Sequence, residues 1–170
     1  VHGFLGPDPA RPEANDVRSG ALAFSPDGTL LAAGHVGAVS IHEVVTGKRL
    51  PIARGHVSIG KVVAFTADSR RVVTSGPAHG PVIQVFDAMS GIPVRSFTGG
   101  DQSPFALAVR SDGLEIASAN FQQPEISVWD TGSGRIVRIL TGHTWPIRAL
   151  EYSRDGRFLA SAAPGGGVIV

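Results

Sequence analysis

Residues 151–162 read EYSRDGRFLASA, a short apolar run followed by an Asp-Gly turn and a second apolar run. Asp-Gly between alternating apolar residues predicts a β-hairpin, because glycine readily adopts the positive φ that the tight turn requires. Three earlier stretches share the pattern: AFSPDGTLLAAG from Ala23, AFTADSRRVVTSG from Ala64 and AVRSDGLEIASA from Ala108. The turn acids are Asp27, Asp68, Asp112 and Asp155, which are 41, 44 and 43 residues apart. The chain is therefore built of repeats with a period of about 43 residues.

Each repeat predicts four short strands. In the third unit, apolar runs cover 105–109, 115–119, 125–129 and 136–140, with turn residues between them. These runs are too short for helices and are interrupted by Gly or Pro, so we expect an all-β chain of four-stranded antiparallel sheets. A repeat of this length cannot bury its own faces and must stack on its neighbours. Stacked sheets offer a contact surface to partners rather than a single reaction pocket.

The units follow one another without a linker. We place them in one domain, at about 1–43, 44–87, 88–130 and 131–170. Residues 1–6 align with 94–99, the fourth strand of the second unit, and residues 7–15 (PDPARPEAN) read as a polar insertion in the connecting loop. The chain stops within a third strand, at 168–170. This stop, and a first residue that is Val rather than Met, favour a piece of a longer protein.

The composition excludes several classes of function for this chain. Apolar residues make up 42% of the chain, and 15 Lys and Arg balance 14 Asp and Glu. Because no run of like charge exceeds two residues, we expect no nucleic-acid or membrane-surface partner. The absence of cysteine excludes disulfides, thiolate zinc sites and thiol nucleophiles. No apolar stretch approaches the roughly 18 residues of a membrane span. With no export signal in the sequence, the cytoplasm is the default expectation.

Several motifs recur at fixed places in the units. Gly142-His143 precedes a first strand, residues 153–156 (SRDG) form the turn, and residues 159–161 (LAS) lie in a second strand. Residues 128–130 (VWD) close a third strand. These motifs resemble those of WD-40 repeats, the Trp-Asp repeats that build β-propellers, over about 17–170. The resemblance implies four visible blades of a seven- or eight-bladed ring, or half of a dimeric ring.

The resemblance also implies a function. We expect a non-catalytic scaffold that binds a protein or peptide through loops on the propeller rim, without a cofactor. An alternative is the regulatory or sensory part of a larger signalling enzyme, such as a bacterial protein kinase, whose catalytic domain lies outside this chain. A third, a sugar- or small-ligand-binding propeller, would need abundant aromatic platforms, yet 6% of residues are aromatic. The ring would close through continuation of the chain or through a homodimer.

The structural hydrogen-bond network of the family is incomplete here. The resemblance implies a network of a loop His, a second-strand Ser or Thr, a turn Asp and the Trp. The candidates are His56 and Ser75 in unit two, Ser118 and Trp129 in unit three, and His143 and Ser161 in unit four. Phe86 stands in the place of Trp in unit two, and Asp101 in the place of His in unit three. We therefore expect the blades to depend more on apolar packing.

The sequence contains no catalytic or metal-binding motif. Its histidines lack the close pairing with each other or with carboxylates that zinc ligands show. The turn acids lack the D-x-D-x-D-G density of a calcium loop, so Asp27, Asp112 and Asp155 are interpreted as turn formers and Asp130 as the end of a third strand. A Gly-x-Ser-x-Gly elbow is absent, and residues 165–167 (GGG) lack the following Lys-Ser or Lys-Thr of a phosphate loop.

Partner binding gives the more specific hypothesis. The resemblance places the loops between strands four and one, and between strands two and three, on one rim. Aromatic residues and Arg are enriched at the centres of interfaces. The candidate rim residues are Trp145, Arg148, Phe121, Gln122 and His79. In the alternative interpretation, Trp145 caps the edge of its blade and Phe121 folds back on its sheet.

Overall fold

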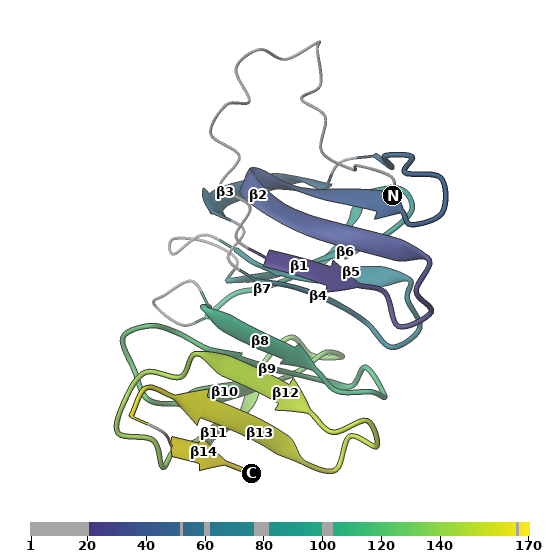
Figure 1. Ribbon diagram of the computed structural model, residues 1–170. Coiled ribbons are helices and arrows are strands. Elements are labelled where there is room, and N and C mark those ends of the chain that lie inside the picture. Colours follow the sequence, from purple (N-terminus) through teal and green to yellow (C-terminus); the bar gives the residue numbers. More distant parts are fainter. Residues whose placement is uncertain (1–20, 52, 60–61, 77–81, 100–103, 166) are drawn as a thin grey trace.

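A computed structural model describes residues 21–51, 53–59, 62–76, 82–99, 104–165 and 167–170 (Figure 1). For residues 35–37 and 53–59 it describes the backbone alone. The strand expected at 1–6, the insertion expected at 7–15 and the candidate rim residue His79 lie outside the described residues.

The described residues form strands and turns and contain no helix, which confirms the all-β prediction. The strands are β1 (Ala21–Phe24), β2 (Leu30–Glu43), β3 (Ala53–Ile59), β4 (Val63–Phe65), β5 (Arg71–Ser75), β6 (Ile83–Asp87), β7 (Pro93–Phe97), β8 (Ala106–Val109), β9 (Glu115–Ala119), β10 (Ile126–Asp130), β11 (Ile136–Leu140), β12 (Ala149–Tyr152), β13 (Leu159–Ala163) and β14 (Gly167–Ile169). In the third unit, each of the four observed strands agrees with its predicted range to within one residue.

The strands form four antiparallel sheets in chain order. The first sheet is β1-β2-β3, the second β4-β5-β6-β7, the third β8-β9-β10-β11 and the fourth β12-β13-β14. Figure 1 shows them stacked one on the next, from the purple first sheet to the yellow fourth. The sheets are offset from the predicted units by one strand. For example, β7 lies in the unit 88–130 but pairs with β6 of the second sheet.

The first sheet contains a fourth strand segment inside β2. The N–H of Val44 donates to Thr29 O at 2.8 Å, although these residues flank the two ends of the 14-residue β2. A fully extended strand of that length would span roughly 46 Å, so β2 must reverse direction. Its first half pairs with β1, at Leu31 and Phe24, and its second half pairs with β3, at Val39 and Ala53. The first sheet thus follows the same four-strand plan.

Aspartate shapes each turn between the first two strands of a sheet. Asp27 Oδ1 accepts a hydrogen bond from Thr29 N at 3.0 Å and another from Ser25 Oγ at 2.6 Å. The equivalent acids accept from the N–H groups two residues on: Asp68 from Arg70, Asp112 from Leu114 and Asp155 from Arg157. These side-chain bonds to the backbone fix an Asx-type turn, which explains why Asp recurs at this position.

Three apolar layers hold the stack together. The first and second sheets bury Ile41, Val72 and Phe86 between them, and the second and third bury Phe97 and Trp129. The third seam is lined by small residues of the third sheet, Ala106, Ala108, Ala117 and Ala119, against which Leu150, Tyr152 and Leu159 of the fourth sheet pack. The stacked sheets are consistent with successive propeller blades, as predicted.

Candidate partner-binding rim

The strand order places two kinds of loop at the same end of the stack. In each sheet the Asp turn joins the end of the first strand to the start of the second. The connection that enters the first strand and the loop that leaves the second strand therefore lie at the opposite end. We call this end the loop rim and the other end the turn rim. In the third and fourth sheets, the loop rim includes residues 104–105, 120–125 and 141–148.

The loop after β9 is shaped by the side chain of Asn120. Its Oδ1 accepts hydrogen bonds from the N–H groups of Gln122 at 2.9 Å and Gln123 at 2.8 Å. These bonds form an Asx turn that holds the backbone of residues 121–123 close to Asn120. As a result Phe121 is directed outward and is 51% exposed, and Gln122 is exposed beside it.

Phe121 contributes to a cluster that joins the third and fourth sheets. Its ring centroid lies 5.9 Å from that of Phe105, with the rings inclined at 53°. The guanidinium carbon of Arg148 lies 4.2 Å from the centroid of Phe121 and 5.0 Å from that of Phe105. Both distances are within cation–π range. We call these three residues the aromatic cradle. The structure thus brings together two of the predicted rim residues, Phe121 and Arg148.

The backbone of the fourth sheet positions the arginine. Arg148 directly precedes β12, and its N–H donates to Ala162 O of β13 at 2.8 Å. Ile147, the residue before it, is fully buried in the seam. The hydrogen bond to Ala162 and the buried side chain of Ile147 fix the backbone at Arg148. The Arg148 side chain extends from there to the loops of the third sheet.

Trp145 occupies a different part of the rim. It is 60% exposed, and a Cβ added to Gly165 would lie 3.8 Å from its Cδ1 atom. Its indole therefore lies against the turn between β13 and β14, within its own sheet. This position resembles the edge-capping alternative, although most of the side chain remains accessible. Phe121 contacts Phe105 of its own sheet and, in addition, Arg148 of the fourth sheet.

A small depression adjoins the cradle on the side of the second sheet. Its lining residues are Val82, Gly99, Pro104, Ser118, Ala119, Asn120, Gln123, Glu125, Ser127 and Trp129. Pro104 and Asn120 are the chain neighbours of Phe105 and Phe121, so the depression and the cradle share the same two loop segments. The depression offers amide and hydroxyl groups and the carboxylate of Glu125 beside the loops that carry the cradle.

Pairs of the family network are present beneath the rim. Trp129 Nε1 donates to Ser118 Oγ at 2.8 Å in a buried position, and His143 Nε2 lies 2.9 Å from Ser161 Oγ. In the second sheet the predicted Ser75 is one residue out of register. Thr74 pairs with Gln84 as Ser118 pairs with Ser127, so Thr74 holds the equivalent position. The side chain of His56, in β3, lies outside the described atoms.

The correction at Ser75 has a physical cause. Thr74 and Ser75 are adjacent hydroxyl residues, and residue type alone does not show which one faces a given side of the sheet. A shift of one residue exchanges the two faces of a strand. Ser75 Oγ is buried without a hydrogen-bond partner among the described residues.

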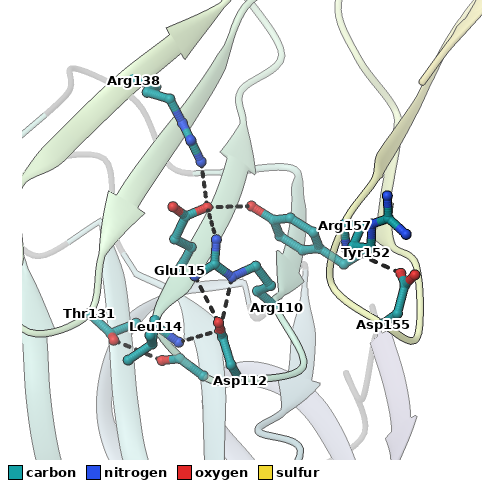
Figure 2. A network of polar contacts seen from close by, with 10 residues as sticks. Arg110, Asp112, Leu114, Glu115, Thr131, Arg138, Tyr152, Asp155 and Arg157 are labelled. Atoms are coloured by element: carbon teal, nitrogen blue, oxygen red, sulfur yellow. Dashed lines mark hydrogen bonds and ion pairs between the residues drawn. The ribbon is translucent and has the colours of Figure 1, made fainter.

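A polar network ties the third sheet to the fourth nearer the turn rim (Figure 2). Glu115 Oε2 accepts from Arg138 Nη2 at 2.5 Å, lies 3.1 Å from Arg110 Nη1 and accepts from the hydroxyl of Tyr152 at 3.4 Å. Arg110 also bonds Asp112, and this contact raises the pKa of Arg110. Burial, together with the charge of Glu115, raises the pKa of Tyr152 to about 12.

Sequence reasoning missed Phe105 and the Glu115–Tyr152 contact. Phe105 was counted as the start of a strand run, and its place directly after Pro104 was the available signal. The Glu115–Tyr152 contact joins residues 37 positions apart on different sheets. Nothing in the local pattern of either residue could have shown it.

The aspartates of the described residues accept hydrogen bonds in turns, and Glu115 forms ion pairs. Hydrogen bonds from Ser25 and Thr29 lower the pKa of Asp27 to about 2, and Ser133 lowers the pKa of Asp130. Acids held so strongly in the ionised form are poorly suited to proton transfer near neutral pH. Among the described residues, no three His, Asp or Glu side chains gather as a metal site. The same residues contain no helix that is long and apolar enough to cross a membrane.

Comparison with known families gives one match. Residues 134–170 match the family model of the WD domain, G-beta repeat. A search of the curated proteins found no match to the chain. The matched segment covers the fourth sheet and the loop-rim residues Trp145 and Arg148. The match shows that residues 134–170 are similar to one WD-40 repeat, and the other three sheets share the turn chemistry of that segment.

Proposed function

We propose that the chain is a non-catalytic scaffold that binds a protein or peptide segment along the loop rim of its third and fourth sheets. WD-40 repeats in general serve as protein-interaction scaffolds, and residues 134–170 match that family. The finer proposal rests on one observation, the aromatic cradle. Phe121 and Arg148 are exposed and Phe105 is half-buried, the three residues come from two different sheets, and aromatic residues and Arg are enriched at interface centres.

The mechanism is display on a rigid frame. Ile147, which precedes Arg148, is buried. Ala119 is also buried, and its carbonyl oxygen accepts a hydrogen bond from the N–H of Phe105 at 2.7 Å. The Asn120 turn fixes the loop that carries Phe121. A partner that docks here meets loops that are already ordered, so little conformational entropy is lost on binding. The adjoining depression offers hydrogen-bonding groups for the backbone of an extended segment.

A peptide selection with matched variants tests the proposal. Random peptides displayed on phage are selected on the immobilised chain, and the dissociation constants of synthetic copies are measured by calorimetry. Phe121→Ser removes one of the two phenyl rings of the aromatic cradle. Phe158→Ser is the control, because Phe158 is equally exposed, at 52% against 51%, also lies under an arginine, and is on the turn rim.

We expect selected peptides to bind wild type and Phe158→Ser alike, and Phe121→Ser at least about tenfold more weakly, as for a truncated interface hot spot. Failure to select any peptide would contradict the proposed function. Selected peptides that lose affinity with Phe158→Ser and keep it with Phe121→Ser would place binding on the turn rim instead.

A further inference from the structure

Arg148 differs from the other arginines that contact the third sheet. Arg110 and Arg138 form ion pairs with Asp112 or Glu115, and Arg95 donates to the backbone oxygens of Thr131 and Gly132. The guanidinium of Arg148 contacts the faces of two phenyl rings and forms no hydrogen bond or ion pair with the described residues. It is an exposed cation that is oriented but not neutralised.

The contact with the phenyl rings leaves the hydrogen-bonding capacity of the guanidinium unused. A phenyl ring accepts no conventional hydrogen bond, and the five side-chain N–H donors of Arg148 have no partner among the described residues. Each exposed cation–π contact contributes about 0.5–1 kcal/mol, which is enough to favour one orientation of the side chain. A ligand that accepts two parallel hydrogen bonds therefore meets a donor fork that is already in place.

We infer that Arg148 binds a carboxylate, the Asp or Glu side chain of a partner peptide, while the phenyl rings of the cradle contact the residues next to it. This inference rests on the proposed function and names the chemistry of the partner. The apolar rings reduce solvent access on one side of the guanidinium, which strengthens a charge-assisted bond made at its edge. The residues that follow Phe121, Gln122 and Gln123, have neutral side-chain amides, and the carboxylate of this loop, Glu125, lines the adjoining depression.

The peptides selected on wild type provide the test. We expect them to be enriched in Asp and Glu, and a Glu→Gln exchange in the peptide should weaken binding about 10- to 100-fold, as expected for a hydrogen bond to a charged group. Arg148→Gln should lose the same factor and should no longer distinguish the Glu peptide from the Gln peptide. Arg148→Lys should be intermediate, because it keeps the charge without the planar fork.

The chain contains a matched control in Arg157. Its guanidinium carbon lies 5.7 Å from the ring centroid of Phe158, so it is another exposed arginine over a phenyl ring, but on the turn rim. Arg157→Gln should bind every peptide as wild type does. Thermal unfolding of Arg148→Gln should stay close to that of wild type, which separates lost binding from lost folding.

Other outcomes overturn the inference in distinguishable ways. Peptides that depend on Phe121 but show no acidic enrichment, and bind Arg148→Gln equally well, would refute the carboxylate site and leave the proposed function standing. A peptide that binds only with phosphoserine in place of Glu would show that the group recognised is a phosphate. If no peptide is selected at all, both the proposed function and this inference fail.

Discussion

The third and fourth sheets have equivalent residues on equivalent faces, but only one of these faces is covered. In the third sheet the face is buried in the seam with the fourth sheet, whereas in the fourth sheet it is the outer face. Ala117 pairs with Ala108 in the third sheet as Ala160 pairs with Glu151 in the fourth. Ala117 and Ala108 are buried, whereas Glu151 is exposed. Farther along, Ile126 is 4% exposed and Val168, its register equivalent, is 67% exposed.

A second comparison concerns the other face of the sheets, which is covered in the fourth sheet and exposed in the first. Leu150 and Tyr152 of the fourth sheet pack against the alanines of the third. Leu22 and Phe24 hold the same register in the first sheet and are 66% and 64% exposed. Burial at a given position depends on whether a neighbouring sheet covers it.

The largest expected effect comes from the same substitution on the two faces. Ala117→Asp places a carboxylate in the seam, where Ala117 is fully buried, and should destabilise the fold by about 3–5 kcal/mol or prevent folding. Ala160→Asp should cost about 1 kcal/mol at most, because Asp is only a poor strand residue there. Urea unfolding followed by circular dichroism measures both. Equal costs would show that the two faces do not differ in the way described.

The sequence predicted the repeated framework because its signals are local. Asp155 and Gly156 define a turn within a few residues, and alternation within 115–119 defines a strand, so these elements followed from short patterns. Phe121 and Arg148 could be chosen as rim residues from their loops alone. Their contact could not, because it depends on how two sheets stack. The same is true of Glu115 and Tyr152.

A medium loss of stability is expected at Trp129, whose indole hydrogen bond to Ser118 has no equivalent in the phenyl side chain of Phe86 of the second sheet. Trp129 donates to the buried Ser118, and Phe86 holds the register of Trp129 in the second sheet. Trp129→Phe should cost about 1–3 kcal/mol, because Ser118 Oγ would lose its hydrogen-bond donor within the core. Ser118→Ala on the Trp129→Phe background should recover part of that cost.

A double-mutant cycle of these variants measures the coupling between the two side chains. We expect a coupling energy of about 1 kcal/mol, in the range typical of contacting residues. If the single and double variants were strictly additive, the hydrogen bond would contribute nothing, and bulk alone would distinguish Trp129 from Phe86.

A smaller loss of stability is expected at alkaline pH, from the ionisation of Tyr152, which contacts Glu115 between the third and fourth sheets. The chain has a single tyrosine, so absorbance at the tyrosinate band reports Tyr152 alone. We expect it to titrate near pH 12 in the folded chain and near pH 10 in urea. Since the folded pKa is the higher one, its contribution to stability is complete below pH 10 and is lost as the pH rises towards 12.

Tyr152→Phe should therefore show a flatter dependence of stability on pH between 10 and 12 than wild type. The two proteins differ only at residue 152, so the difference between their stability curves isolates the contribution of Tyr152. Glu115→Gln should lower the pKa of Tyr152 part of the way towards its ordinary value, because burial, which is the larger cause, remains. A folded chain whose tyrosine titrates near pH 10 would contradict the buried position described for this side chain.

The smallest effect is expected at Ser69, where the second sheet departs from the other three. Ser69 has a φ of 60°, whereas Gly28 and Gly156 hold the equivalent turn positions at 72° and 71°. Its hydroxyl accepts a hydrogen bond from the N–H of Asp27 in the first sheet at 3.2 Å. Ser69→Gly relieves about 1 kcal/mol of backbone strain and loses a hydrogen bond of similar size, so stability should change little. Ser69→Ala keeps the strain and loses the bond, and should cost about 1 kcal/mol. If Ser69→Gly were instead clearly stabilising, the hydrogen bond between the first two turns would contribute nothing, and the apolar layer alone would hold the seam between the first and second sheets.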